Sequence, residues 1–211
     1  MAVTSYKFPT ATTTIESPSG VVWTNYTYIM EDDSNFATCG ASSKDIDSYY
    51  LVGSSFSFSS EDIPDGSTID GIEVVIDRKI TYVGDIGTGK IHDLSLYLQN
   101  DSGQVGSNYA SASSWPTSVD TATYGGASDM WGTTLSYDDV VASTFGVRLQ
   151  VRIDVDTSTS LVANVNYIKV RISYTEGSSS SIKTIDGLAK TSVKVIDGLA
   201  IASVKTYNNL A

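Results

Sequence analysis

Residue types that carry out catalysis are present in this sequence, but their spacing completes no catalytic motif. The segment 84–90, Gly-Asp-Ile-Gly-Thr-Gly-Lys, has the glycine and lysine spacing of a phosphate-binding loop. The next residue is Ile91, where such a loop needs Ser or Thr to hold magnesium. A strand-like segment follows, in place of the helix whose N-terminus would face the phosphates. We therefore expect the loop of a hairpin between strands at 80–83 and 93–98.

Histidine and cysteine each occur once, as His92 and Cys39. A Ser-His-Asp triad and a cysteine nucleophile would both have to use His92. This residue lies beside a predicted strand, and no nucleophile-elbow motif occurs in the chain. We expect structural roles for both residues, and a single cysteine permits no internal disulfide.

Carboxylates are plentiful, so residue type alone does not exclude a glycosidase pair. The acidic runs 31–33, 61–62 and 138–139 lie beside turn-like sequence, where such side chains are normally solvated. The segment 154–158 alternates oxygen ligands that would suit calcium, but it lacks the glycine and distal glutamate of an EF-hand loop. We expect a loop there, and we predict no cofactor, no metal site and no catalytic residue.

The stretch from Ser107 to Tyr137 is long, aromatic and rich in glycine, with little periodicity. A loop of this length usually carries function or packs over the end of a sheet. Trp115, Tyr124 and Trp131 are candidates for a ligand surface on which a sugar would stack. The alternative is that the tryptophans close the open end of the fold and bury apolar area.

Charge and hydropathy exclude several classes of partner. The net charge is −11, and the basic residues are scattered, so nucleic acid is not an expected partner. No apolar run approaches the length of a membrane span. The N-terminus does not have the pattern of a signal peptide. We therefore expect synthesis in a cytoplasm, with release by lysis as a route out of the cell.

Alternation of apolar and polar residues with period two is the main structural signal. It occurs in 55–58, 69–79 and 93–98, and most clearly in 145–153. Turn sequences such as 63–66, Ile-Pro-Asp-Gly, separate these segments. The pattern predicts an all-β protein, an antiparallel β-sandwich of jelly-roll type.

The alternation also predicts which side chains enter the core. In 145–153 the inward residues are Phe145, Val147, Leu149, Val151 and Ile153, and the outward ones are Arg148, Gln150 and Arg152. In 69–79 one face carries Ile72, Val74 and Ile76. We expect 164–174 to pair with 145–153 and to direct Ile168, Val170 and Ile172 inward.

The sequence divides into a sandwich domain at 1–175, a Gly/Ser linker at 176–180 and a tail at 181–211. The tail contains three repeats of the type Ser-Ile-Lys-Thr-Ile-Asp-Gly-Leu-Ala, spaced by 11 residues. β-Branched residues fill the repeats, and Asp-Gly or Asn-Asn occurs at a fixed place, which favours hairpins. The apolar residues at matched places are Ile182, Ile185, Leu188, Val193, Ile196, Leu199, Val204, Tyr207 and Leu210.

Two or three short strands are not stable alone in water, so the tail needs a partner surface. We expect it to dock outside its own sandwich, with one lysine in each repeat at Lys183, Lys194 and Lys205. The alternative is a tail folded back onto its own body.

The repeats and several body segments together resemble bacteriophage virion structural proteins. The body segments are Phe56-Ser57-Phe58, 63–66, 69–74, Tyr124-Gly125-Gly126, 129–132, 145–147 and 165–168. The resemblance implies a repeated copy on a virion, as a capsid decoration protein or a tail, neck or fibre component, and leaves that choice open.

We therefore expect a non-catalytic virion protein that assembles through its tail with sister copies and other virion proteins. Open strand edges and closed symmetry favour a homo-oligomer, with a trimer as the first expectation. A carbohydrate-binding or adhesin module that recognises host glycans is the alternative, and a glycan-degrading enzyme is a third hypothesis.

Overall fold

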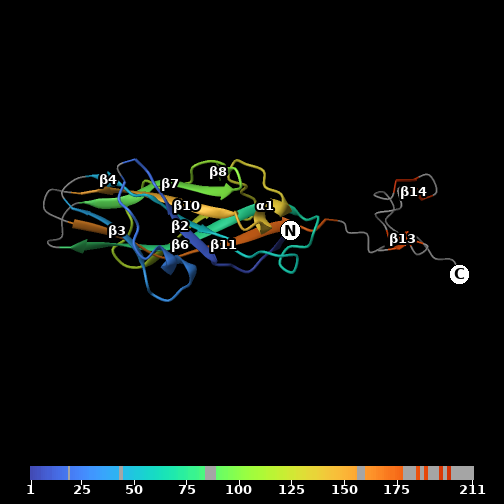
Figure 1. Ribbon diagram of the computed structural model, residues 1–211, viewed down its shortest axis with the longest axis horizontal. Coiled ribbons are helices and arrows are strands. Elements are labelled where there is room, and N and C mark those ends of the chain that lie inside the picture. The colour runs from blue at the N-terminus through green and yellow to red at the C-terminus, as the bar shows by residue number, and fades with distance from the viewer. Residues whose placement is uncertain are drawn as a thin grey trace.

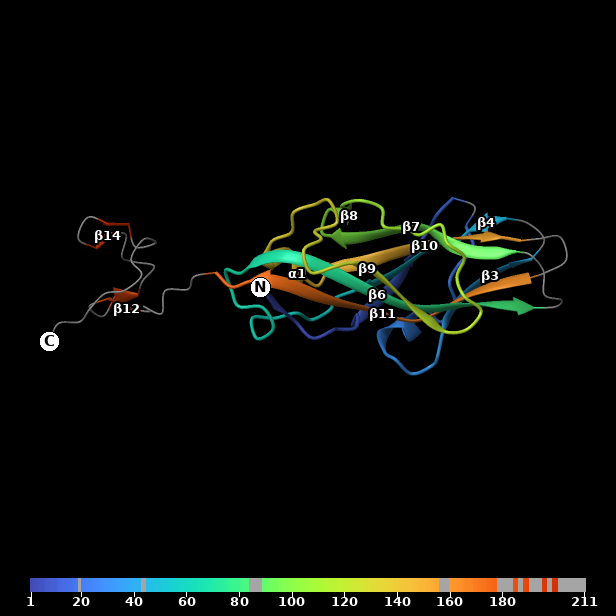
Figure 2. The ribbon, with the colours of Figure 1, turned by 180° about the vertical axis from the view of Figure 1, so that it is seen from behind.

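Two antiparallel sheets packed face to face form the body of the protein (Figures 1 and 2). The computed structural model describes residues 1–18, 20–42, 45–83, 89–155 and 160–177, with four two-residue strands nearer the C-terminus. Within these residues the helices are short: the 3-10 helix η1 (Tyr26–Met30) and the α-helix α1 (Tyr137–Val141). The predicted antiparallel β-sandwich is confirmed.

The five-stranded sheet contains the two longest strands, each of 16 residues. Its order is β1 (Ala2–Val3), β11 (Ser160–Thr175), β6 (Thr68–Val83) and β9 (Asp120–Gly125), and β3 (Ala37–Ser42) also pairs with β11. β11 and β6 pair along their whole lengths, from Ser160 opposite Val83 to Thr175 opposite Thr68.

The six-stranded sheet forms the other layer. Its order is β2 (Ala11–Ile15), β5 (Tyr50–Ser54), β10 (Gly146–Asp154), β7 (Lys90–Asn100) and β8 (Gly103–Val105), and β4 (Ile46–Asp47) also pairs with β10. β10 is therefore central, with β5 and β4 on one side and β7 on the other.

The core lies between the two layers and contains the predicted inward residues. All five apolar side chains of 145–153 are fully buried, as are the two predicted triplets on β6 and β11. Because side chains alternate across a strand, burial of one set places the other set on the outer face. The inward faces predicted for 145–153 and 164–174 are thus confirmed, and the apolar face named in 69–79 is the buried face of β6.

The predicted strand partners were wrong. β10 and β11 belong to different sheets and face each other across the core, so 164–174 does not pair with 145–153. β6 and β7 also belong to different sheets, so they form no hairpin, and residues 84–88 lie outside the described part. The alternation pattern identifies an inward face, but it does not encode the neighbouring strand.

The segment 55–58, where alternation predicted a strand, is not a strand, although both of its phenylalanines are buried. β5 ends at Ser54, and Ser55 and Ser57 have φ angles of 57° and 54°. Phe56 packs on Phe145 with ring centroids 6.0 Å apart. The two left-handed serines turn an irregular segment so that both phenylalanines reach the core.

The start of the chain lies beside the place where the chain leaves the sandwich. β1 pairs with the end of β11, with Ala2 opposite Tyr174 and Val3 opposite Ser173. Figure 1 shows the N-terminus at this end, with β4 at the opposite end. No helix within the described residues has the length and apolar character needed to cross a membrane.

Short hairpins occur in two of the three repeats. β12 (Thr184–Ile185) pairs with β13 (Leu188–Ala189), and β14 (Val195–Ile196) pairs with β15 (Leu199–Ala200). The two pairs flank the Asp-Gly dipeptides at 186–187 and 197–198, where tight turns were predicted. The tail's side chains and the whole third repeat lie outside the described residues.

Candidate functional site

Trp115, Tyr124 and Trp131, the predicted ligand surface, lie inside the molecule. Their exposed fractions are 2%, 7% and 0%. A sugar cannot stack on rings enclosed in this way, so we correct their assignment from ligand surface to core. The long aromatic segment packs against the sheets because this placement buries its large apolar rings.

Trp115 and Tyr124 both donate hydrogen bonds to the buried carboxylate of Asp93. The indole Nε1 of Trp115 lies 2.7 Å from Oδ1, and the Tyr124 hydroxyl lies 2.6 Å from Oδ2. The backbone N–H of Ser111 also donates to Oδ2, and Arg78 forms an ion pair with Oδ1. Burial and the nearby Asp93 raise the pKa of Tyr124. Four donors thus satisfy this carboxylate, which favours a structural role over proton transfer.

Trp131 fixes the second half of the aromatic segment. Its Nε1 donates to the backbone oxygen of Ile72 at 2.9 Å, and its ring stacks on Tyr109 with centroids 4.2 Å apart. The Tyr109 hydroxyl donates to Asp129, and this bond is the main cause that raises the pKa of Tyr109 to about 12. The segment is held by specific contacts to β6 and to its own turns.

The outer face of the six-stranded sheet carries the candidate functional site. The alternation of β10 places Arg148, Gln150 and Arg152 there, as the sequence predicts. Across the ladder to β7, these residues lie opposite Tyr97, Ser95 and His92. Two strands thus bring aromatic, amide and charged side chains together on one surface.

Arg148 lies in an aromatic row on this face. Its guanidinium is 4.6 Å from the centroid of the Tyr50 ring, and its register partner on the other side is Tyr97. Both tyrosines and Arg148 are partly exposed. The Nε–H of Arg148 has no hydrogen-bond partner among the described residues. This row therefore holds a guanidinium with a buried, unpaired Nε–H, on a strand flanked by two partly exposed tyrosines.

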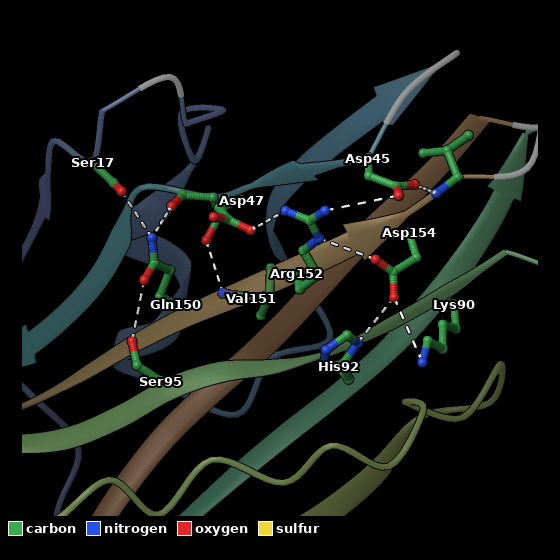
Figure 3. A network of polar contacts seen from close by, with 12 residues as sticks. Ser17, Asp45, Asp47, Lys90, His92, Ser95, Gln150, Val151, Arg152 and Asp154 are labelled. Carbon is green, nitrogen blue, oxygen red and sulfur yellow. Dashed lines mark hydrogen bonds and ion pairs between the residues drawn. The ribbon is translucent and has the colours of Figure 1, made fainter.

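Gln150 occupies the next row and is held by serine and backbone groups. Its Nε2 donates to Ser17 Oγ at 3.0 Å and to the backbone oxygen of Ser48 at 2.9 Å (Figure 3). Ser95 Oγ donates to its Oε1 at 3.2 Å. These bonds connect β10 to β7, to Ser17 after β2, and to Ser48 between β4 and β5.

Arg152 forms the centre of a charged cluster at the end of this face. Figure 3 shows its guanidinium between Asp47, at 2.9 Å, and Asp154, at 3.1 Å, with Asp45 at 3.8 Å. Hydrogen bonds to Asp47 and Asp154 raise the pKa of Arg152. Asp154 also lies 3.5 Å from His92 Nδ1 and 3.7 Å from Lys90 Nζ. The cluster is a network of paired, partly exposed charges.

The other residues considered for chemistry are not brought together. Cys39 is buried on β3, whereas His92 lies on β7 of the other sheet. Burial raises the pKa of the Cys39 thiol. Asp139 caps α1 by a reciprocal bond with Ser136. Residues 156–158 of the considered calcium segment lie outside the described part. Within the described part, no three His, Cys, Asp or Glu side chains gather as metal ligands.

Sequence reasoning missed the tyrosines of the site together with Asp45 and Asp47, and it considered Asp154 only within a possible calcium segment. The alternation predicts that Arg148 and Arg152 face outward, but Tyr50, Asp47 and Tyr97 come from other strands. Their convergence depends on strand order, which the sequence pattern does not contain. The outward Arg-Gln-Arg pattern of β10 was the available signal.

No family model and no curated protein matches the sequence. Among solved structures, one described as "CBM4 structure and function" is 6% identical, covers 66% of this chain and 85% of its own, and has a TM-score of 0.35. The family 11 carbohydrate-binding module of a Clostridium thermocellum cellulase is 11% identical, with coverages of 85% and 92% and a TM-score of 0.32. A structure of infectious bursal disease virus, Gx strain, is 10% identical, with coverages of 78% and 35% and a TM-score of 0.25. At these identities and TM-scores the matches carry no argument about function.

The fold and the site define the class of the protein. It is an antiparallel β-sandwich protein with a repeat tail and a polar and aromatic patch on the outer face of one sheet.

Proposed function

We propose that the chain is a non-catalytic structural component of a bacteriophage virion, attached to sister copies or other virion proteins through its C-terminal repeats. It would be made in the host cytoplasm and act on the particle as a homo-oligomer, with a trimer as the first expectation. The proposal leaves open whether it decorates the capsid or belongs to the tail, neck or fibre.

The observation that carries the proposal is the isolation of the tail hairpins in the sheet topology. Within the described residues, β12 pairs with β13 and β14 with β15, each as a separate two-stranded sheet. A two-stranded hairpin is at best marginally stable alone in water. Repeats of this kind gain stability when they dock on another surface, and the three repeats of one chain multiply the contact.

The chemistry of the body supports a non-catalytic role. The carboxylate of Asp93, which is fully buried, already accepts four donors, and the charged side chains around Arg152 are paired with one another. Groups held in this way lack the free acid, base or nucleophile that turnover requires.

Removal of the tail tests the proposal. Deleting residues 178–211 should leave a body with the same circular dichroism and nearly the same melting temperature, but one that no longer assembles. The mass of the full chain and of the truncated chain, measured over a range of concentrations, gives the result. A chain that lacks only the third repeat, residues 203–211, is the matched variant, and it should assemble more weakly than the full chain. An unfolded truncated body, or one that assembles normally, contradicts the proposal.

Binding of a host glycan is a second candidate function, because the outer face of the six-stranded sheet has the chemistry that sugars require. Sugar rings pack on aromatic faces, and their hydroxyls bond to fixed polar groups. Tyr50 and Tyr97 supply partly exposed aromatic side chains, and the guanidinium of Arg148, on the strand between theirs, lies 4.6 Å from the centroid of the Tyr50 ring. This role is compatible with a virion protein that attaches to a host.

A glycan array probed with the full chain tests this second function. Binding should be lost in Tyr50→Ala and in Arg148→Met, and retained in Tyr26→Ala, which removes a tyrosine exposed to 37% elsewhere. Binding that survives both substitutions, or the absence of any bound glycan, counts against the site.

A further inference from the structure

A pair of buried side chains on the outer face of the five-stranded sheet has no role in the function proposed above. Asp77 on β6 and Asn166 on β11 are exposed to 5% and 3%. The ladder between β6 and β11 shifts register between Val165 and Tyr167, so Asn166 is the extra residue of a β-bulge. Bulges of this kind re-aim a side chain, and they occur often beside functional sites.

Asn166 bridges two carboxylates through its amide nitrogen. Nδ2 donates to Asp77 Oδ2 at 3.0 Å and to Asp32 Oδ1 at 3.1 Å. This arrangement fixes the orientation of the amide, because the opposite orientation would turn the carbonyl oxygen toward two carboxylates. The Oδ1 atom of Asn166 must therefore find its own partner elsewhere.

Two buried oxygen atoms remain without any donor. Asn166 Oδ1 and Asp77 Oδ1 have no hydrogen-bond partner among the described residues. A buried acceptor without a partner is costly, and more so when it belongs to a carboxylate. Both atoms are hard oxygens, one from a carboxylate and one from an amide.

Negative charge accumulates around these oxygens. Burial raises the pKa of Asp77, and the charges of Asp32 and Asp120 raise it further. The two cations that neighbour Asp77 on β6 contact other groups. The amine of Lys79 lies 4.3 Å from the centroid of the Phe36 ring. Arg78 is directed inward and paired with Asp93. A bound water would donate to the free oxygens, but it would not offset this charge.

We propose that Asp77, Asn166 and Asp32 form a calcium site on the outer face of the five-stranded sheet, with Asp120 adding negative charge. Calcium takes carboxylate and amide oxygens, and it tolerates irregular geometry with water completing the shell. The ion would satisfy both free oxygens. It would also tie together β6, β11 and the loop that follows η1, which are far apart in the sequence.

Calcium titration of the full chain, first freed of metal with EDTA, tests the site. With few protein ligands, we expect half-saturation at roughly 0.1–1 mM, the range of weak extracellular sites. At 10 mM CaCl2 the melting temperature should rise by about 3–11 °C. Isothermal titration calorimetry should give one ion for each chain, and MgCl2 at equal ionic strength should have little effect.

Substitutions assign the response to these residues. Asp77→Asn and Asp32→Asn should each abolish the rise in melting temperature, whereas Asp65→Asn, at an exposed aspartate in a turn, should keep it. Asp32 is exposed, so Asp32→Asn is expected to fold even if Asp77→Asn does not. The proposal is overturned by a wild-type chain that does not respond to calcium, by an equal response to magnesium, or by an unchanged response in Asp32→Asn.

Discussion

Arg78 and Asp93 form an ion pair across the interior of the sandwich, each from a different sheet. Arg78 belongs to β6 and Asp93 to β7, and their side chains are exposed to 9% and 0%. The guanidinium of Arg78 also lies 4.9 Å from the centroid of the Trp115 ring and 5.6 Å from that of Tyr124. The pair therefore links the two sheets to each other and to the aromatic segment.

Asp93→Asn should destabilise the protein by about 3–5 kcal/mol, because Arg78 would keep a buried charge without a counter-ion. Urea unfolding followed by circular dichroism measures the change. Asp65→Asn, at an exposed aspartate, should change the free energy of unfolding by less than about 0.5 kcal/mol. Equal effects of the two substitutions would mean that the buried pair does not stabilise the fold.

Leu149→Ala should cost about 2–5 kcal/mol, because this fully buried side chain on the central strand β10 would leave a cavity. Thermal and urea unfolding give the value. Val83→Ala, which shortens an apolar side chain exposed to 55%, is the control and should be nearly neutral. A small loss for Leu149→Ala would indicate that the core between the layers is loosely packed.

Gly125→Ala should be more destabilising than Gly103→Ala. Both glycines have positive φ angles, 69° and 99°, so an added side chain is strained at each. At Gly125 the new Cβ would also lie 2.3 Å from the backbone oxygen of Ile72 and 2.4 Å from Trp131 Nε1, whereas the space around Gly103 is open. Melting temperatures of the two variants separate the steric clash from the backbone strain.

The stability of the protein should fall as pH rises from about 10 toward 12, partly through Tyr109. The pKa of this residue is raised from 10.0 to about 12, chiefly by its hydrogen bond to Asp129. Below pH 10 the phenol is protonated in both states, and its contribution is fully present. Between the two values the unfolded chain loses the proton first, so unfolding is favoured.

Tyr109→Phe should make this alkaline loss of stability smaller, while Tyr26→Phe, at an exposed tyrosine, should leave it unchanged. Denaturant midpoints measured at pH 8, 10 and 11 give the comparison. An identical alkaline loss in wild type and Tyr109→Phe would show that the bond to Asp129 does not contribute.

The sequence was sufficient to predict the inward faces of the main strands, but not their neighbours. Five alternating apolar residues in 145–153 can be buried together only if they share a face, so their position in the core followed directly. The pairing of β10 with β5 and β7 depends on contacts between residues distant in the chain. Alternation contains no record of those contacts.

The candidate site was only partly predictable for the same reason. The outward position of Arg148 and Arg152 is a local consequence of alternation, and it was predicted. The tyrosines beside Arg148, and Asp45 and Asp47 beside Arg152, come from other parts of the chain through the sheet order, whereas Asp154 is the last residue of β10 itself. For Trp115 and Trp131, residue type alone could not distinguish a ligand surface from a core, and the distinction required the partners that their indole N–H groups find.

The length of β11 determines how far the two ends of the sandwich lie from each other. β11 begins at Ser160, shortly after β10 ends at Asp154, and it runs 16 residues to Thr175, where the chain leaves the body beside its own N-terminus. At about 3.3 Å per residue, a strand of this length spans about 50 Å. If a partner surface binds the chain beyond Thr175, the Arg152 cluster lies at the opposite end of the sandwich from that surface. The Debye length in physiological salt is about 8 Å, so the separation equals several Debye lengths. Charges on that surface would then be screened from the cluster, and whatever approaches the cluster would meet the field of this protein alone.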